Sequence, residues 1–403
     1  MPRGPENSML RWIRGVGLLV AVAGPIAACS PADDSSTPVE SARTSSDAAT
    51  PPSAPAYTAP PVVATVPAPP APTPLAAQAP PALTLVAAQA PQAPAVSASQ
   101  AIDASLYDPA AGPEDRRAQL IRIEVLLDRA HFSPGVIDGR DGGNLRSAIA
   151  AYEAAHSLSG DGRPDRAVWD ALAGADPGPV TTDYVITADD VKGPFIGKTP
   201  TLMEAMAKLG RMDYETPLQL LAEKFHMDQK LLAALNPGAD FAVAGTTIVV
   251  AVPGGGALEG PIARVEVDKG REQVRVLDQV GKAVAVYPAT VGSQERPAPN
   301  GVWAVSVVVK SPTYTYDPQR LTFGKSKTKL TIPPGPNNPV GSTWIGLTKE
   351  TYGLHGTSDP TLVGKVASHG CVRLTNWDAR QLGLAVRKGT PVEFVGEETH
   401  KTT

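Results

Sequence analysis

The sequence predicts a multidomain α+β protein, with a small three-helix domain, a β-α-α-β module and a mostly-β C-terminal domain behind a disordered N-terminal tether. Three observations support this fold class. Proline is unevenly spread, since 16 of the 42 prolines lie in residues 31–100. An apolar period typical of helices begins near residue 113, and an alternating pattern typical of strands begins near residue 261. A chain of 403 residues has room for two or three domains of roughly 100–200 residues each.

Composition excludes two classes of protein. Two cysteines cannot form the disulfide framework of a small secreted module. The 36 basic and 40 acidic residues give a net charge of −4, and there is no long basic run. We therefore expect no nucleic-acid partner, because such binding needs a basic surface.

Residues 1–28 have the pattern of a secretory leader. Arg3, Arg11 and Arg14 precede an apolar run from Val16 to Ala28, which is short for a membrane span of about 20 residues. The run ends directly before Cys29. This arrangement resembles a bacterial lipobox, in which the leader is cut before the cysteine and its thiol carries lipid. An ordinary signal peptide followed by a chance cysteine is the alternative.

The lipobox resemblance implies an anchor and a tether. Acyl chains on Cys29 would contribute about 0.8 kcal/mol per buried CH₂, and Ser30 favours the outer membrane over the inner one. Residues 29–112 should be a disordered Ala/Pro-rich linker, since no charged residue lies between Ala48 and Ile102 and no apolar period appears. Such a linker would hold the folded part away from a membrane; a dispensable tail is the alternative.

Residues 113–176 carry three runs of apolar residues at helical spacing. Two Asp-Gly turns, Asp138-Gly139 and Asp161-Gly162, flank the middle run. This pattern resembles the three-helix peptidoglycan-binding domain. A plain three-helix bundle without a ligand is the alternative.

Residues 180–253 read as a strand, two helices and a closing strand, with Asn236-Pro237-Gly238 ending the second helix. The order resembles a LysM glycan-binding module. The long insertion from Val191 to Glu215 departs from that family. The module is therefore either a glycan binder or a spacer and docking platform.

The chemistry of the chain is concentrated between Leu354 and Arg373, in a region of strands and long proline-rich loops that frame a site. Cys371 is the only cysteine after the anchor Cys29, and a free thiol in an oxidising compartment is usually kept for its reactivity. An adjacent imidazole can lower the thiol pKa from about 8.5 until thiolate is the major form. Gly370 leaves backbone N–H groups accessible for an oxyanion hole.

Three interpretations of this cluster compete. Cys371 is a structural thiol beside packed histidines, or it binds zinc together with His355 and His369, or it is the nucleophile of a Cys/His acyl-transfer site. The zinc interpretation lacks a fourth ligand at a suitable spacing. Many cysteine proteases also use a Cys/His pair.

The motif favours the third interpretation. His355-Gly356-Thr357, followed after a short gap by Ser368-His369-Gly370-Cys371-Val372-Arg373, resembles the signature of L,D-transpeptidases of the YkuD family. The resemblance covers Pro261 to Val395 and implies a mixed β-sandwich at residues 261–397. It also implies action on peptidoglycan stem peptides, with no metal and no cofactor.

The resemblance also implies a role for each residue. Cys371 would attack the third residue of a tetrapeptide donor stem and release D-Ala, with His355 as general base held by the Gly356 carbonyl. Backbone amides near Gly370 and Cys371 would hold the oxyanion. His369 and Arg373 would shape the loop. The substrate groove would be lined by Tyr314, Tyr316, Trp344 and Ser368.

An amine of an acceptor stem would then resolve the thioester into a 3→3 cross-link. Hydrolysis by water, which is L,D-carboxypeptidase activity, and attachment of an envelope protein to the wall share the same acyl-enzyme. An inactive wall-binding anchor is the alternative from another class. We expect a monomer whose wall-binding module raises the local concentration of substrate.

Overall fold

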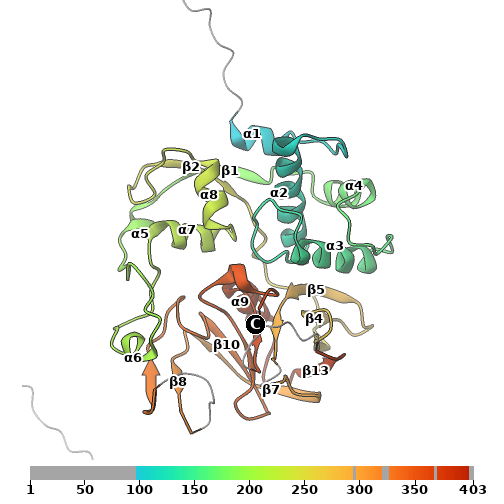
Figure 1. The fold of residues 1–403 in the computed structure, drawn as a ribbon. Helices are drawn as coiled ribbons and strands as arrows, with labels where there is room; N and C mark the ends of the chain where they lie inside the picture. Colours follow the sequence, from blue (N-terminus) through green and yellow to red (C-terminus); the bar gives the residue numbers. More distant parts are fainter. Residues whose placement is uncertain (1–96, 294–295, 320–325, 367–369, 399–403) are drawn as a thin grey trace, which may run out of the picture. The chain divides into compact units, whose positions relative to one another are not determined.

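The computed structural model describes residues 97–293, 296–319, 326–366 and 370–398 (Figure 1). The leader, Cys29 and most of the predicted tether lie outside these residues, as do Ser368 and His369. In the part that is described, no helix is long and apolar enough to cross a membrane.

The first region is helical. Its helices are α1 (Ala98–Asp103), α2 (Pro113–Arg129), α3 (Gly143–Ala155) and α4 (Arg166–Ala175). The apolar faces of α2, α3 and α4 meet in one core that includes Leu127, Ile149 and Trp169. The predicted helical runs therefore form a bundle in which α3 and α4 each pack against α2, which is buried along most of its length.

Helix α1 lies inside the segment that we expected to be disordered up to residue 112, and that expectation is wrong for its last part. Ser97 and Gln100 cap the helix start reciprocally. At its end, Asp103 Oδ1 accepts hydrogen bonds from the backbone N–H groups of Val180 (2.7 Å) and Thr181 (3.1 Å). Composition did not reveal this helix because its partners lie far along the chain.

A buried glutamate organises each Asp-Gly turn. Glu124 Oε2 accepts from Gly139 N at 2.8 Å, and Glu153 Oε2 accepts from Gly162 N at 2.7 Å. Both glycines have left-handed backbones, with φ of 67° and 71°. Burial, followed by the charge of Asp138, raises the pKa of Glu124 well above its usual value.

The second region has two antiparallel strands with helices between them. Its elements are β1 (Thr181–Val185), α5 (Ala188–Val191), α6 (Met203–Met206), α7 (Pro217–Lys224), α8 (Gln229–Leu235) and β2 (Thr247–Ala251). Asn236 links α8 to β2: its Nδ2 donates to Leu232 O and Val249 O, and its Oδ1 accepts from Val249 N at 2.6 Å. This explains why an asparagine ends the second predicted helix.

The C-terminal region is mostly β, as predicted. Its strands are β3 (Arg264–Asp268), β4 (Gln273–Leu277), β5 (Ala283–Pro288), β6 (Thr290–Val291), β7 (Gly301–Lys310), β8 (Tyr314–Tyr316), β9 (Leu330–Ile332), β10 (Thr343–Leu347), β11 (Gly353–His355), β12 (Val372–Arg373) and β13 (Pro391–Val395). A 3-10 helix, η1 (Pro360–Leu362), and α9 (Asn376–Ala385) complete it.

Nine of these strands are joined by hydrogen bonds in the order β5-β4-β3-β13-β7-β10-β11-β12-β6. The long strand β7 makes the sheet continuous, because its first residues pair with β13 and its later residues pair with β10. Helix α9 packs against β10 and β11 (Figure 1). Strands β8 and β9 form a separate hairpin.

The helical region covers the edge of this sheet. Ser133 N donates to Val286 O (2.9 Å), and Val286 N donates to His131 O (2.8 Å), so the turn after α2 pairs with edge strand β5. The same turn also contacts α9, because Ser133 Oγ donates to Asp378 Oδ2 at 3.1 Å. Covering an edge in this way satisfies backbone groups that would otherwise be open to another chain.

Candidate active site

The two halves of the sequence motif lie on neighbouring parallel strands. Strand β11 pairs with β12 so that Leu354 is opposite Val372 and His355 is opposite Arg373. Cys371 directly precedes β12. The gap in the motif is therefore the length of chain needed to cross from one strand to its parallel neighbour.

His355 is buried and held in one tautomer. Its side chain is 5% exposed, and its Nδ1 lies 2.6 Å from Gly356 O. Because a carbonyl only accepts, Nδ1 carries the proton and Nε2 is the free acceptor. The ring stacks on Trp344, with 5.6 Å between centroids. Burial, followed by the charge of Arg373, lowers the pKa of His355 to about 4.

Cys371 departs from the expected thiolate. Burial raises the pKa of its thiol, although a backbone hydrogen bond from Gly353 and the charges of Arg296 and Arg373 act in the opposite direction. The thiol of Cys371 and the imidazole of His355, which line the same cavity, are therefore both neutral at neutral pH. General-base catalysis, in which an imidazole takes the proton of an attacking thiol, is the chemistry that suits two such groups.

Two residues of the site were missed by the sequence analysis. The Sγ of Cys371 lies 3.7 Å from Thr351 O, in position to donate to it. Thr351 has a φ of 68°, an unusual conformation for a β-branched residue. Arg296 Nη2 donates to Thr351 Oγ1 at 3.0 Å and thereby supports that turn. Neither Thr351 nor Arg296 belongs to a sequence motif. The only sequence feature that pointed to Arg296 was its position in one of the long proline-containing loops that were expected to frame the site.

Both the backbone conformation at position 370 and the nearby side chain of Arg296 favour glycine at this position. Its φ is 98°, and a Cβ at this position would lie 2.9 Å from Cγ of Arg296. A side chain at 370 would thus displace the side chain of Arg296. The glycine before the nucleophile therefore sets the local geometry as well as access to the backbone.

The site opens into a cavity of about 720 Å³ that is lined by Cys371, His355 and Arg373. Of the predicted groove residues, Tyr314 and Trp344 line it. Tyr316 does not: it is 1% exposed, and its hydroxyl donates to Ser326 O, so its polar end is held inside the β8–β9 hairpin. The placement of Tyr316 in the groove is therefore wrong.

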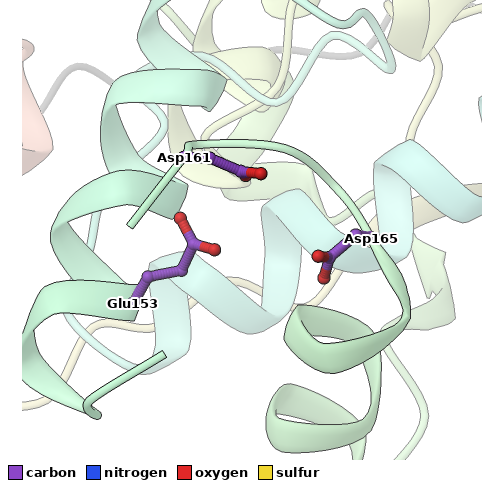
Figure 2. Close-up of side chains that lie close together, drawn as sticks. All are labelled: Glu153, Asp161 and Asp165. Atoms are coloured by element: carbon purple, nitrogen blue, oxygen red, sulfur yellow. The ribbon is translucent and has the colours of Figure 1, made fainter. Parts of the chain in front are cut away.

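Among the described residues, one group of side chains has the spacing of a metal site, and it lies far from Cys371 in the sequence. Carboxylate oxygens of Glu153, Asp161 and Asp165 lie within 4.8 Å of one another (Figure 2). Each accepts a backbone hydrogen bond: Glu153 from Gly162, Asp161 from Arg163, and Asp165 from Val168. These bonds give the cluster a structural role in closing a turn and capping α4.

The comparisons agree with this site. Residues 262–394 match the YkuD family of L,D-transpeptidase catalytic domains, and residues 116–172 match a family of putative peptidoglycan binding domains. A putative L,D-transpeptidase YkuD of Bacillus licheniformis is 26% identical over 177 residues, 44% of this chain and 92% of the relative. A probable L,D-transpeptidase ErfK/SrfK of Escherichia coli is 28% identical over 199 residues, 47% of this chain and 63% of the relative.

The chain thus spans most of the Bacillus relative and less than two thirds of the Escherichia coli one. Among solved structures, an L,D-transpeptidase from Stackebrandtia nassauensis aligns over 74% of this chain and 98% of its own, with 14% identity and a TM-score of 0.29. L,D-transpeptidase 3 from Mycobacterium tuberculosis with a faropenem-derived adduct aligns over 38% of this chain and 76% of its own, with 17% identity and a TM-score of 0.27.

Fold and site together define a mostly-β acyl-transfer domain, with a histidine at the end of one strand and a cysteine directly before the parallel neighbouring strand. Residues 262–394 are an L,D-transpeptidase catalytic domain of the YkuD family, and residues 116–172 are a peptidoglycan-binding domain. A chain with these two domains belongs to the cell envelope, where peptidoglycan lies.

Proposed function

We propose that the protein is an L,D-transpeptidase that forms 3→3 cross-links between peptidoglycan stems. The observation that carries this is the placement of Cys371 and a neutral, buried His355 on one cavity. The thiol sulfur attacks the carbonyl of the third residue of a tetrapeptide donor while its proton passes to Nε2 of His355. The bond to D-Ala then breaks, and the same proton leaves with the D-Ala amine.

The second half of the reaction restores the thiol. A side-chain amine of an acceptor stem attacks the thioester, the new amide forms, and sulfur takes back a proton. Backbone N–H groups near Gly370 and Cys371 stabilise the oxyanion in both steps, and losing one such donor typically costs about 2.7–4 kcal/mol. His369 and Arg373 shape the loop, and Ser368 completes the motif.

Mass spectrometry of purified disaccharide-tetrapeptides incubated with the enzyme tests this function. Cross-linked dimers with loss of D-Ala support it; tripeptides alone indicate an L,D-carboxypeptidase, and a product joined to an envelope protein indicates an attachment enzyme. The variant Cys371→Ala should form no product and keep the fold. Activity in that variant would overturn the role of Cys371, and no acyl-enzyme in the wild type would leave only the inactive wall-binding anchor.

The remaining parts of the chain fit a tethered wall enzyme. Residues 1–28 act as a lipoprotein signal peptide, Cys29 as the lipid attachment point in the outer membrane, and residues up to about 96 as the linker. Cys29→Ala should then move the protein from the membrane fraction to the soluble fraction. We also expect a monomer, which sedimentation of the variant released by Cys29→Ala can check.

The second region, residues 180–253, corresponds to a LysM-like module. Two antiparallel strands with α7 and α8 between them support this assignment, and so does Asn236 joining α8 to β2. Its role is either glycan binding or docking. Pull-down with purified sacculi, comparing the full chain with a variant altered on α8, separates the two.

A further inference from the structure

The insertion from Val191 to Glu215 has no place in a LysM-like pattern, and the structure shows where it goes. Helix α6 within it packs against strand β9 of the catalytic domain (Figure 1). The side chain of Met203, the first residue of α6, lines the cavity that also contains Cys371 and His355. A residue from outside the catalytic domain therefore contributes to the wall of its cavity.

The insertion is fastened to the catalytic domain by its own backbone. Met212 is fully buried; its N–H donates to Pro334 O (2.9 Å), and its carbonyl accepts from Asn337 N (2.9 Å). The Nδ2 of Asn337 donates to Asp213 O at 2.9 Å. Asn337 also exchanges hydrogen bonds with Gln219 on α7. These paired contacts fix the register between the insertion and the loop from β9 to β10.

That loop itself forms part of the cavity. Gly335 adopts a φ of 149°, and any Cβ at this position would overlap the carbonyl of Met212. A few residues further on, Pro339 and Val340 line the cavity beside Met203. The contact between the insertion and the β9–β10 loop therefore depends on Gly335, which leaves room for the backbone of Met212. The same loop then provides the cavity-lining residues Pro339 and Val340.

We propose that this insertion forms one wall of the substrate cavity and that Met203 is a specificity-determining residue. The residues that line the cavity together with Met203 include the apolar Val309, Pro339 and Val340 and the charged Asp317 and Lys329. A flexible thioether fits an aliphatic chain of varying shape. Met203 therefore contacts the aliphatic part of a stem-peptide side chain, a substrate class that rests on the proposed function. The position of the wall does not rest on it.

The first test measures access to the thiol without any substrate. In the full chain with Cys29→Ser, Cys371 is the only cysteine, and its alkylation by iodoacetamide is compared with that by a bulky dye-maleimide. Met203→Trp should slow the maleimide about tenfold relative to iodoacetamide, because the larger side chain narrows the cavity for the bulky reagent. Met206→Trp is the matched control, because Met206 lies on the same helix and does not line the cavity.

Each outcome of this test decides the proposal. Equal maleimide rates in Met203→Trp and Met206→Trp would contradict the proposal that Met203 forms part of the cavity wall. So would an equal slowing of iodoacetamide and maleimide in Met203→Trp. Met203→Leu keeps the volume and should react as the wild type does, and an unchanged iodoacetamide rate in Met203→Trp shows that this variant is not simply misfolded.

The second test uses the tetrapeptide donor. Met203→Ala should lower kcat/KM for D-Ala release by about tenfold, and Met206→Ala should leave it unchanged. A wild-type protein that releases no D-Ala contradicts the proposed function, while the alkylation comparison still decides the wall. An active wild type with two equal alanine variants would show that Met203 does not contact the substrate.

Discussion

His355 donates its Nδ1–H to the carbonyl oxygen of Gly356 across 2.6 Å. The bond joins neighbours in the sequence, so the local turn sets the tautomer without help from a carboxylate. It also orders the ring that must accept the thiol proton at Nε2. Among the described residues no acidic group stabilises the imidazolium, so burial dominates and the histidine stays neutral over a wide range of pH.

Acylation should therefore keep an active base in mildly acid solution. Because burial lowers the pKa of His355 to about 4, the acid limb of kcat/KM should fall near pH 4 and not near 6.5. Stopped-flow acylation of Cys371 by a carbapenem across pH 3.5–8 measures this, with tryptophan fluorescence as a control for folding. An inflection near 6.5 would show that the imidazole is not desolvated as described.

The thiol should react slowly at neutral pH, and Arg296 should control how slowly. Burial raises the pKa of Cys371, and the charge of Arg296 opposes this shift. Alkylation by iodoacetamide should accelerate only at alkaline pH, and Arg296→Gln should move that rise further up. Peptide mapping assigns the modification to Cys371.

Lys349→Gln is the matched control for this prediction. Lys349 and Arg296 each lie 5.3 Å from the ring of Tyr352, and only Arg296 lines the cavity. The profile of the Lys349 variant should coincide with that of the wild type. If both variants shift equally, the effect comes from general surface charge and not from a cation at the site.

Much of the site followed from the sequence because its chemistry is local. His355, Gly370 and Cys371 sit in two short segments, and strand pairing brings the segments together. The protonation state did not follow, since it depends on burial by the whole domain. Thr351 and Met203 could not be found either: one acts through its backbone carbonyl, and the other comes from an insertion far upstream in the chain. Tyr316 has the right residue type but its hydroxyl is bonded elsewhere.

The contact between α9 and the helical region should depend on pH. Burial, followed by the charge of Asp128, raises the pKa of Asp378 to about 7. The folded protein therefore keeps this proton over a range in which the unfolded chain has lost it. The contribution of Asp378 to the free energy of unfolding is therefore highest below about pH 4. It falls by about 4 kcal/mol in total as the pH rises to about 7.

Asp378→Asn should remove that part of the pH dependence. Urea unfolding at pH 5 and pH 8 should show a smaller loss of unfolding free energy in the variant than in the wild type. Ser133 can still donate to the amide oxygen, so the contact survives. Asp189→Asn, at a side chain that is 85% exposed, should match the wild type. If Asp378→Asn loses as much unfolding free energy between pH 5 and pH 8 as the wild type does, the titrating group is not Asp378.

The Asp-Gly turns allow a stability prediction with an internal control. Gly160 and Gly162 have nearly the same φ, 74° and 71°, but a Cβ at 160 would meet open space, whereas one at 162 would lie 2.6 Å from Arg146 O. Gly160→Ala should cost only the left-handed backbone, about 1–2 kcal/mol. Gly162→Ala must also push α3 away and strain the bond to Glu153, so it should cost clearly more. Unfolding in urea measures both; equal losses would mean that Arg146 O yields freely and that φ alone makes the glycine necessary.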